Sequence, residues 1–330
     1  MGGLWPKITV TPHFSGRHHQ HLTSDPTHHT FLNSHKKSNM PLELLTLNGL
    51  SPSDLPPQSA PPDALAPFLT SILEEAIPFI DSVAPKISPS HSPSPEWASK
   101  GSKTYSTSDA TVQLFQRVVD TMRSGADKGE TWICRRSVHA DSDETGKKSA
   151  NWDEFWNGFK ERHVEVEREF TGSVVGVEHV WKWEGEGLEL PISSTTYTSI
   201  TLTLHLIRHR IGRPILKDRT FPILLFTCAA SRSEFLTITL PVPSLLASSE
   251  ISDSTRKKYN DSVIGSYVSA ERIRKMEDSG EIEWIMTTAS DAKGVLPMWV
   301  QNRAVPGQIA KDVPNFLTWA ARERAKAEGK

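Results

Sequence analysis

Cysteine and long apolar runs are both scarce in this sequence of 330 residues. Only Cys134 and Cys228 are present, and two thiols in a chain of this length do not build the disulfide framework of a small secreted domain. No stretch reaches the roughly 18 apolar residues that a membrane-spanning helix needs, and the N-terminus lacks the apolar core of a secretory signal. We therefore expect a soluble, cytoplasmic protein.

Net charge is also nearly absent, since 37 Lys and Arg face 39 Asp and Glu and the formal charge is -2. A nucleic-acid partner usually requires an excess of positive charge, so we expect none. The sequence also has no Gly-x-Ser-x-Gly elbow, no His-Glu-x-x-His pair and no Cys-x-x-Cys pair. We accordingly name no catalytic residue, no metal ligand and no cofactor.

The chain begins with a segment that is rich in histidine. Residues 1–39 hold seven of the 13 histidines and show little apolar periodicity, so we predict that they are disordered. Three interpretations of this segment are open: an upstream leader before a start at Met40, an organelle-targeting sequence, or a plain tail. We assign residues 40–105 to an N-terminal helix with a Pro/Ser-rich linker, and residues 106–326 to the main domain.

Two amphipathic helices are predicted between residues 63 and 122. The first runs from Asp63 to about Val83, with Pro78 interrupting its apolar stripe. A Pro- and Ser-rich loop over residues 85–102 separates it from the second. Neither helix has the basic opposite face of a membrane-surface helix, so we expect both to cover a core. The second helix carries Val112, Phe115, Val118, Val119 and Met122.

Short strands joined by turns fill most of the remaining chain and predict an antiparallel sheet. A helix over residues 151–170 interrupts them, and Asn151 and Glu154 have the spacing of a capping box at its start. The strand candidates are Glu130–His139, Ser173–Trp183, Thr195–His209, Arg219–Ala230, Glu234–Val242, Val263–Arg274 and Glu281–Ala289.

The two faces of this sheet differ in polarity. Along one strand, aliphatic residues alternate with polar ones, which places them on opposite faces. An apolar face must be buried, and we expect the last amphipathic helix, Pro306–Lys326, to cover it. Pro314 predicts a kink or a break in that helix. The alternating residues are Ile200, Leu202, Leu204 and Leu206 against Thr201, Thr203 and His205.

The C-terminal part of the sequence resembles a known family of domains. The run TTASDAKGVLPMW, Thr287–Trp299, resembles the end of START domains, where a final strand leads through an Asp-x-Lys-Gly turn into a C-terminal helix. Four further segments resemble a fungal family of unknown function, domain of unknown function 3074, within the START superfamily. These segments are WICRRSVH at 132–139, WDEF at 152–155, RTFPILLFT at 219–227 and YVSAERI at 267–273.

The resemblance covers about residues 110–322 and implies a fold rather than a reaction. That fold is an α+β helix grip, in which a curled antiparallel sheet packs on a long C-terminal helix, here with extra N-terminal helices. It also implies a ligand cavity between the sheet and the helix.

Large side chains on or beside the predicted strands are candidates for contacting such a ligand, although packing in a dry core would account for them as well. Trp284 and Met286 share a strand face and are the first candidates, because a flexible Met beside a Trp suits an apolar ligand. The full set is Trp132, Cys134, Arg136, Trp181, Trp183, Tyr197, Tyr267, Trp284, Met286 and Trp299.

The strand over residues 130–139 also carries two arginines. If Trp132 faces the ligand, alternation brings Cys134 and Arg136 to the same face and leaves Arg135 outside. An arginine fork can bind an anionic head group through two hydrogen bonds. The alternative is a surface or ion-paired role.

These observations favour a noncatalytic protein that binds a lipid or other hydrophobic small molecule. A second form of this hypothesis adds the transfer of that molecule. We expect a monomer that contacts a membrane transiently. A small-molecule enzyme of the cyclase-like kind found among helix-grip proteins is one alternative, and it predicts a titratable pocket group such as His139 or Glu271. A protein-interaction adaptor is the other, and it predicts a cavity filled by the protein's own side chains.

Overall fold

The fold is known from a computed structural model. It describes residues 42–84, 93–121, 129–144, 148–211, 215–295 and 298–329, without the side chains of Trp299 and Val300. All of these residues belong to the unit Ser38–Lys330. The predicted leader, residues 1–39, lies outside the described residues, and the boundary at residue 105 stays a prediction.

Strands dominate the described chain. They are β1 (Ala98–Tyr105), β2 (Ser108–Val119), β3 (Glu130–His139), β4 (Val174–Trp183), β5 (Leu190–Ile192), β6 (Thr195–His209), β7 (Arg219–Ser231), β8 (Glu234–Pro241), β9 (Val263–Ile264), β10 (Ser266–Lys275) and β11 (Ile282–Asp291).

The α-helices are α1 (Pro62–Asp81), α2 (Trp152–Phe155), α3 (His163–Phe170), α4 (Asp253–Tyr259) and α5 (Met298–Ala327). A π-helical segment, η2 (Trp156–Glu161), joins α2 to α3, and short 3-10 turns lie at η1 (Pro52–Asp54) and η3 (Leu245–Ala247). Among the described helices, none has both the length and the apolar character that crossing a bilayer requires.

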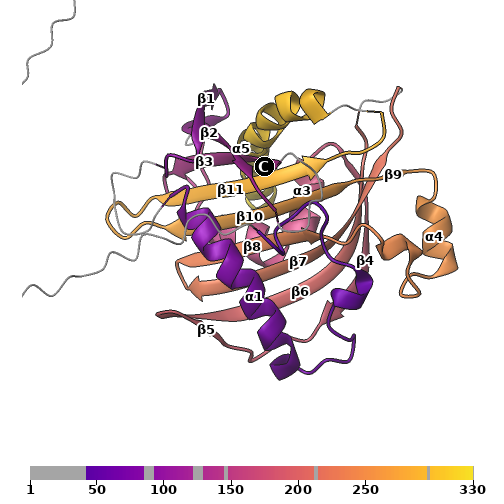
Figure 1. The fold of residues 1–330 in the computed structure, drawn as a ribbon. Helices are drawn as coiled ribbons and strands as arrows, with labels where there is room; N and C mark the ends of the chain where they lie inside the picture. Colours follow the sequence, from indigo (N-terminus) through magenta and orange to yellow (C-terminus); the bar gives the residue numbers. More distant parts are fainter. Residues whose placement is uncertain are drawn as a thin grey trace, which may run out of the picture. The chain divides into compact units, whose positions relative to one another are not determined.

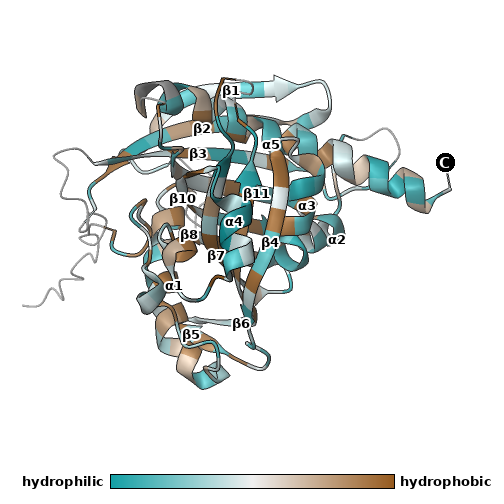
Figure 2. Ribbon diagram, turned by 90° about the vertical axis from the view of Figure 1, so that its right-hand side faces the viewer, coloured by the Kyte–Doolittle hydropathy of each residue, from teal (hydrophilic) through white to brown (hydrophobic). Residues whose placement is uncertain are grey.

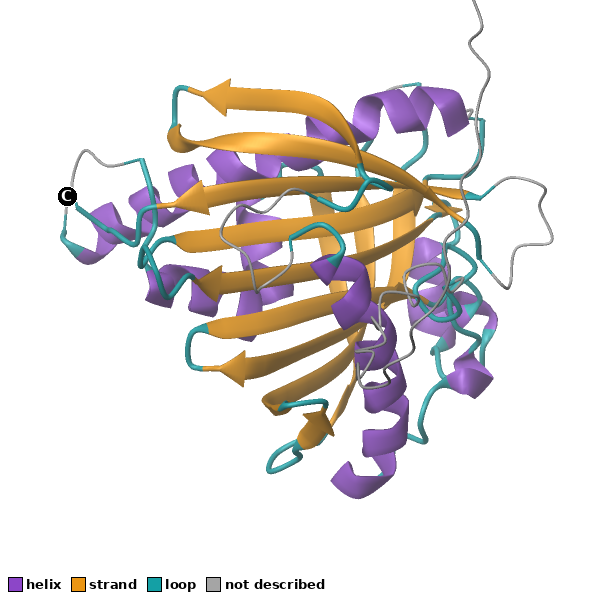
Figure 3. Cartoon of the chain, turned by 60° about the vertical axis from the view of Figure 1, so that its left-hand side comes forward, coloured by secondary structure: helices purple, strands orange, loops and turns teal. Residues whose placement is uncertain are grey.

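One 11-stranded sheet holds these strands together in the order β1-β2-β3-β11-β10-β8-β7-β6-β4, with β5 paired to β6 and β9 to β7. Figure 3 shows the strands as a curved stack. All pairs are antiparallel except β7 with β9. Strand β11 lies between β3 and β10, so it joins strands from distant parts of the sequence.

Helices cover both faces of the sheet. Helix α1 lies on one face, and α2, α3 and α5 lie on the other (Figures 1 and 2). We call the first the α1 face, which carries Leu204, Leu224 and Ile238. The second is the α5 face, which carries Ile133 and Trp284 against α5. The two faces have separate apolar clusters, so the central strands are buried on both sides, whereas the edge strand β1 is exposed.

The expectation that the last helix covers the aliphatic face was wrong. Leu202, Leu204 and Leu206 pack in one cluster with the buried residues of α1. Thr203 and His205, on the opposite face, are buried as well. Alternation shows that two faces differ, but it does not show which helix covers each of them when both are covered.

The second predicted helix was also wrong, because residues 108–119 form β2 between β1 and β3. Ala110, Val112 and Leu114 are buried while Thr111 and Gln113 are exposed, which is the period of a strand. The same segment also fits a helical stripe, and pairing with β3 decides between the two. The predicted loop over residues 85–102 likewise ends in β1, and residues 85–92 lie outside the described part.

Several local predictions are confirmed. Asn151 Oδ1 accepts a hydrogen bond from the Glu154 amide at 3.0 Å, and Glu154 Oε2 accepts one from the Asn151 amide at 2.8 Å, so the capping box begins α2. The turn after β11 is present, with Lys293 and Gly294 at positive φ. The predicted break at Pro314 is wrong, since α5 continues through it, while the alternative of a kink there stays a prediction. Thr318 Oγ1 donates to the Pro314 carbonyl at 2.7 Å.

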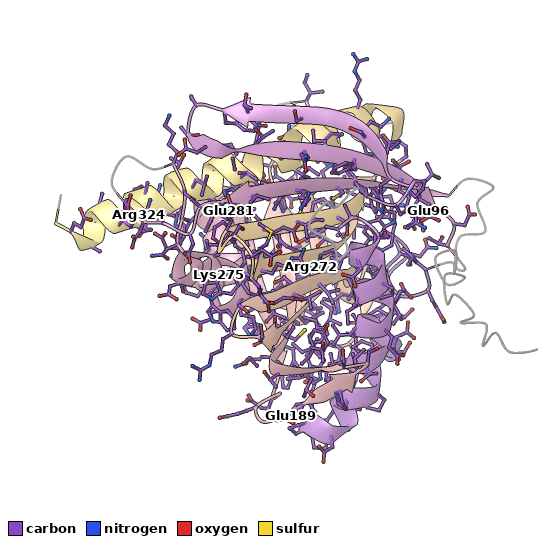
Figure 4. All side chains as sticks on the ribbon, turned by 90° about the vertical axis from the view of Figure 1, so that its left-hand side faces the viewer. Glu96, Glu189, Arg272, Lys275, Glu281 and Arg324 are labelled. Carbon is purple, nitrogen blue, oxygen red and sulfur yellow. The ribbon has the colours of Figure 1, made fainter. Side chains whose placement is uncertain are left out.

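A buried ion cluster on the α1 face ties helix α1 to the sheet. Glu283 is fully buried, and its carboxylate lies 2.7 Å from Arg136 Nε and 2.7 Å from Arg274 Nε. Arg272 Nη2 lies 3.8 Å from the same carboxylate, and the Arg272 guanidinium also pairs with Asp81 at the end of α1. Figure 4 labels Arg272 beside this end of the helix.

Candidate functional site

A buried arginine stands at the centre of the α5 face. The Arg135 side chain is 2% exposed, and its Nη2 donates to Glu271 Oε1 at 3.0 Å. Trp284 Nε1 donates to the same oxygen at 2.6 Å. The guanidinium carbon lies 3.8 Å from the centre of the Trp284 ring, which is a cation–π distance. Adjacent strands β3, β11 and β10 therefore hold these three side chains in one fixed arrangement.

The Arg135 guanidinium has further nitrogen donors besides the one that binds Glu271. Among the described residues, neither Nε nor Nη1 has a hydrogen-bond partner. Asp312 of α5 lies near Nε, but its Oδ2 is 4.0 Å away and thus beyond hydrogen-bond distance. Buried polar groups are satisfied in most folded proteins, so the two unpaired donor nitrogens of this buried side chain are able to bind a further acceptor.

Two carboxyl groups lie deep in the fold and yet remain partly accessible. Burial raises the pKa of Glu167 on α3 to about 8, with the charges of Asp312 and Glu271 adding to the shift. Burial likewise raises the pKa of Asp312 to about 7, although Arg135 opposes it. Water nevertheless reaches 26% of the Glu167 side chain and 28% of Asp312.

Arg135 and five side chains around it are linked by contacts or by the effect of one group on the pKa of another. We call this cluster the inner recess and define it by Arg135, Glu167, Tyr267, Glu271, Met286 and Asp312. Tyr267 and Met286 are also partly accessible, and burial together with the charge of Glu167 raises the pKa of Tyr267. Met286 Sδ lies 3.8 Å from Arg135 Nη2. The cluster therefore combines the polarisable apolar side chain of Met286 with carboxyl groups and an arginine.

We expect the unliganded protein to lose stability as the pH rises from about 7 to about 8. Because the pKa values of Glu167 and Asp312 are raised, the folded state holds more protons than the unfolded state in this window, and stability then falls with pH. Buried histidines with lowered pKa, such as His139 and His205, act with the opposite sign, but only below their ordinary value of 6.5. Urea unfolding at each pH measures the slope.

Glu167→Gln should flatten that slope, whereas Glu165→Gln, on the exposed side of the same helix, should leave it unchanged. A wild-type profile as flat as that of Glu167→Gln would contradict the raised pKa.

Three of the ten predicted ligand contacts lie on the α5 face, namely Tyr267, Trp284 and Met286. Trp284 is fully buried and packs among Phe155, Phe159 and Phe316, while the other two border the inner recess. The side chain of a fourth candidate, Trp299, lies outside the described ones. The ligand contacts of all these residues stay predictions.

The other six candidates lie on the α1 face. The prediction that Arg135 is left outside was wrong, because the α5 face to which it points is itself covered by helices. Trp132 and Cys134 do share a face, as predicted, and that face is packed by α1: the Trp132 ring lies 4.7 Å from that of Phe79. Arg136 pairs with Glu283. Trp181, Trp183 and Tyr197 also join the α1 cluster.

The sequence reasoning missed Glu167 and Asp312. One signal was present for Asp312, since it stands three residues after Ile309 and four before Phe316 and so lies on the apolar stripe of its helix. An acid on an apolar stripe is unusual and marks a buried polar site. Glu167 stands in a similar position between His163 and Phe170 on α3.

Comparison with known structures agrees with this architecture. Human STARD10 is similar with a TM-score of 0.50 and 12% identity, covering 78% of this chain and 82% of that one. Human StAR-related lipid transfer protein 5 gives a TM-score of 0.50 and 12% identity, covering 79% of this chain and 98% of that one. The fold is therefore START-like: α+β, with a large antiparallel sheet gripping a long C-terminal helix.

Sequence comparison places the chain within one family of this class. The family model described as "Protein of unknown function (DUF3074)" matches residues 132–320, which is more than half of the 330 residues. The chain belongs to this family. No curated protein matches its sequence.

Proposed function

We propose that this protein binds a lipid or other hydrophobic small molecule in the inner recess, without catalysing a reaction. The observation that carries the proposal is Arg135, a buried arginine with two free donors beside a partly accessible Met286. Such a site provides a hydrogen-bonding anchor for one polar end of a ligand. Apolar and aromatic side chains of the α5 face then shield the rest of the molecule from water.

The likeness to solved structures supports this proposal at the level of the class. One of the two similar proteins is named a lipid transfer protein. By analogy, the proposal includes a transient contact with a membrane, at which the ligand passes from one apolar phase to another at small cost in free energy. It also includes a monomer that works in the cytoplasm, in keeping with two buried free thiols.

Replacing the anchor tests the proposal. Arg135→Met combined with Glu271→Gln removes the ion pair without leaving one buried charge unpaired. We expect ligand affinity to fall at least about tenfold, because a hydrogen bond to a charged group contributes about 1.5–3 kcal/mol. The wild-type protein is purified from its host, its bound lipid is identified by native mass spectrometry and extraction, and the affinity of that lipid is then measured for each variant.

Arg168→Met is the matched control, since Arg168 is exposed on α3, and it should bind as the wild type does. The proposal fails if the wild-type protein is empty and shows no affinity for sterols, phospholipids or fatty acids. Equal affinity in the double variant and the wild type would show that Arg135 is not the anchor.

A small-molecule enzyme is the second candidate, and one observation favours it. The pKa values of Glu167 and Asp312 lie near neutrality, where a carboxyl can serve as a general acid or base. A bound small molecule that leaves the protein chemically changed would support this alternative, whereas a lipid recovered intact supports simple binding.

A further inference from the structure

A pocket opens on the α5 face, at the β4 end of the sheet. Its volume is about 410 Å³. Strands β8 and β7 separate β6, which lines this pocket, from β10, which lines the inner recess. Its polar lining is Lys160 of η2, Lys182 of β4, Glu184 and Glu186 of the following turn, and Ser199 and Thr201 of β6.

Lys160 differs from the other polar residues of this pocket because it is buried, with 5% of its surface exposed. Within the described part of the chain, no carboxylate lies within 4.0 Å of its ammonium group and no acceptor bonds to it. Burial lowers the pKa of Lys160, and its electrostatic interactions with Cys228 and Glu161 only partly oppose this effect. Lys160 therefore gives up its proton more readily than an exposed lysine does.

The backbone that carries Lys160 is fixed in an unusual conformation. Lys160 belongs to the π-helical segment η2, a kind of helix that is frequent at functional sites. Two sheet threonines hold this segment in place: Thr237 Oγ1 donates to the Phe159 carbonyl at 3.0 Å, and Thr227 Oγ1 donates to the Lys160 carbonyl at 3.3 Å. The amine therefore stands on a rigid support at the wall of an open pocket.

We propose that Lys160 is a reactive lysine that forms a reversible imine with an aldehyde or ketone entering this pocket. The neutral amine attacks the carbonyl carbon and gives a carbinolamine. The carbinolamine hydroxyl then takes a proton and leaves as water, and loss of the nitrogen proton completes the C=N bond, so that amine and carbonyl yield imine and water. Hydrolysis reverses these steps, and no oxidant or reductant is needed. Desolvated lysines in protein pockets carry out this chemistry.

The proposal is tested on the full chain with 4-hydroxybenzaldehyde as the probe. Imines are trapped at pH 7 with sodium cyanoborohydride, and the modified lysines are located by peptide mass spectrometry. We expect Lys160 to be labelled faster than exposed Lys257, because a lowered pKa raises the fraction of the neutral, nucleophilic amine at pH 7. The labelling rate of Lys160 should also reach its plateau at a lower pH.

Lys160→Arg keeps the charge but removes the nucleophile and should abolish the fast labelling, whereas Lys257→Arg, outside the pocket, should retain it. The comparison of Lys160 with Lys257 within the wild-type protein does not depend on whether either variant folds. The inference is overturned if Lys160 is labelled no faster than Lys257, or if the fast labelling survives in a folded Lys160→Arg protein.

Discussion

Glu283→Ala is expected to lower the free energy of unfolding by about 3–5 kcal/mol, the usual result of removing one partner from a buried ion cluster. The glutamate is fully buried among the guanidinium groups of Arg136, Arg272 and Arg274. Burial alone would raise its pKa, but the three arginines lower it by more, so the carboxylate is charged. Without it, three positive charges share one buried position.

Urea unfolding at neutral pH measures this loss. Glu281→Ala is the matched control, because Glu281 is exposed just before the same strand (Figure 4). It should change stability by no more than about 0.5 kcal/mol. If Glu283→Ala is as mild as the control, the arginines are satisfied by other groups and the cluster does not fasten α1 to the sheet.

Phe316→Ala should cost about 3–5 kcal/mol for a different reason, the cavity that it leaves. Phe316 is fully buried on α5, and its ring centre lies 4.9 Å from that of Phe155 and 4.7 Å from that of Phe159. Gly158 of η2 packs so closely on it that a Cβ there would lie 2.9 Å from the Phe316 ring. Few neighbours can relax into the vacated space, since they belong to separate, fixed elements.

Asn315→Ala is the control for this variant, since Asn315 is exposed on the same turn of α5, and it should leave stability within about 0.5 kcal/mol of the wild type. A loss below about 1 kcal/mol for Phe316→Ala would mean that α5 is loosely packed. Asp312 precedes Phe316 by one helical turn, so a loosened α5 should also weaken binding in the inner recess.

The strands were largely predictable because their signals are local. Alternation and turns located β4, β6, β7, β8, β10 and β11 within a few residues. Residues 108–119 misled the prediction because their apolar residues fit both a helical and a strand period. Long-range pairing with β3 settled that conflict, and no local pattern reveals a partner that lies far away in sequence.

The inner recess was harder to predict than the sheet. Trp284 and Met286 were identified because large side chains on a strand are visible in the sequence. The burial of Arg135, by contrast, depends on α3 and α5, which cover the face that the alternation marks as polar. Its pairing with Glu271 depends on strand order and register, which a single sequence does not contain.

The position of β11 has a consequence for protein synthesis. In the described sheet, β11 joins the group β1-β2-β3 to the group that begins at β10. The ribosome makes β11 after all the other strands of this sheet. Strands β3 and β10 therefore each have an unpaired edge until residues 282–291 have emerged. A nascent chain in this condition is a substrate for chaperones and prone to aggregate. Premature termination before β11 should therefore yield two separate half-sheets rather than a shortened but working protein.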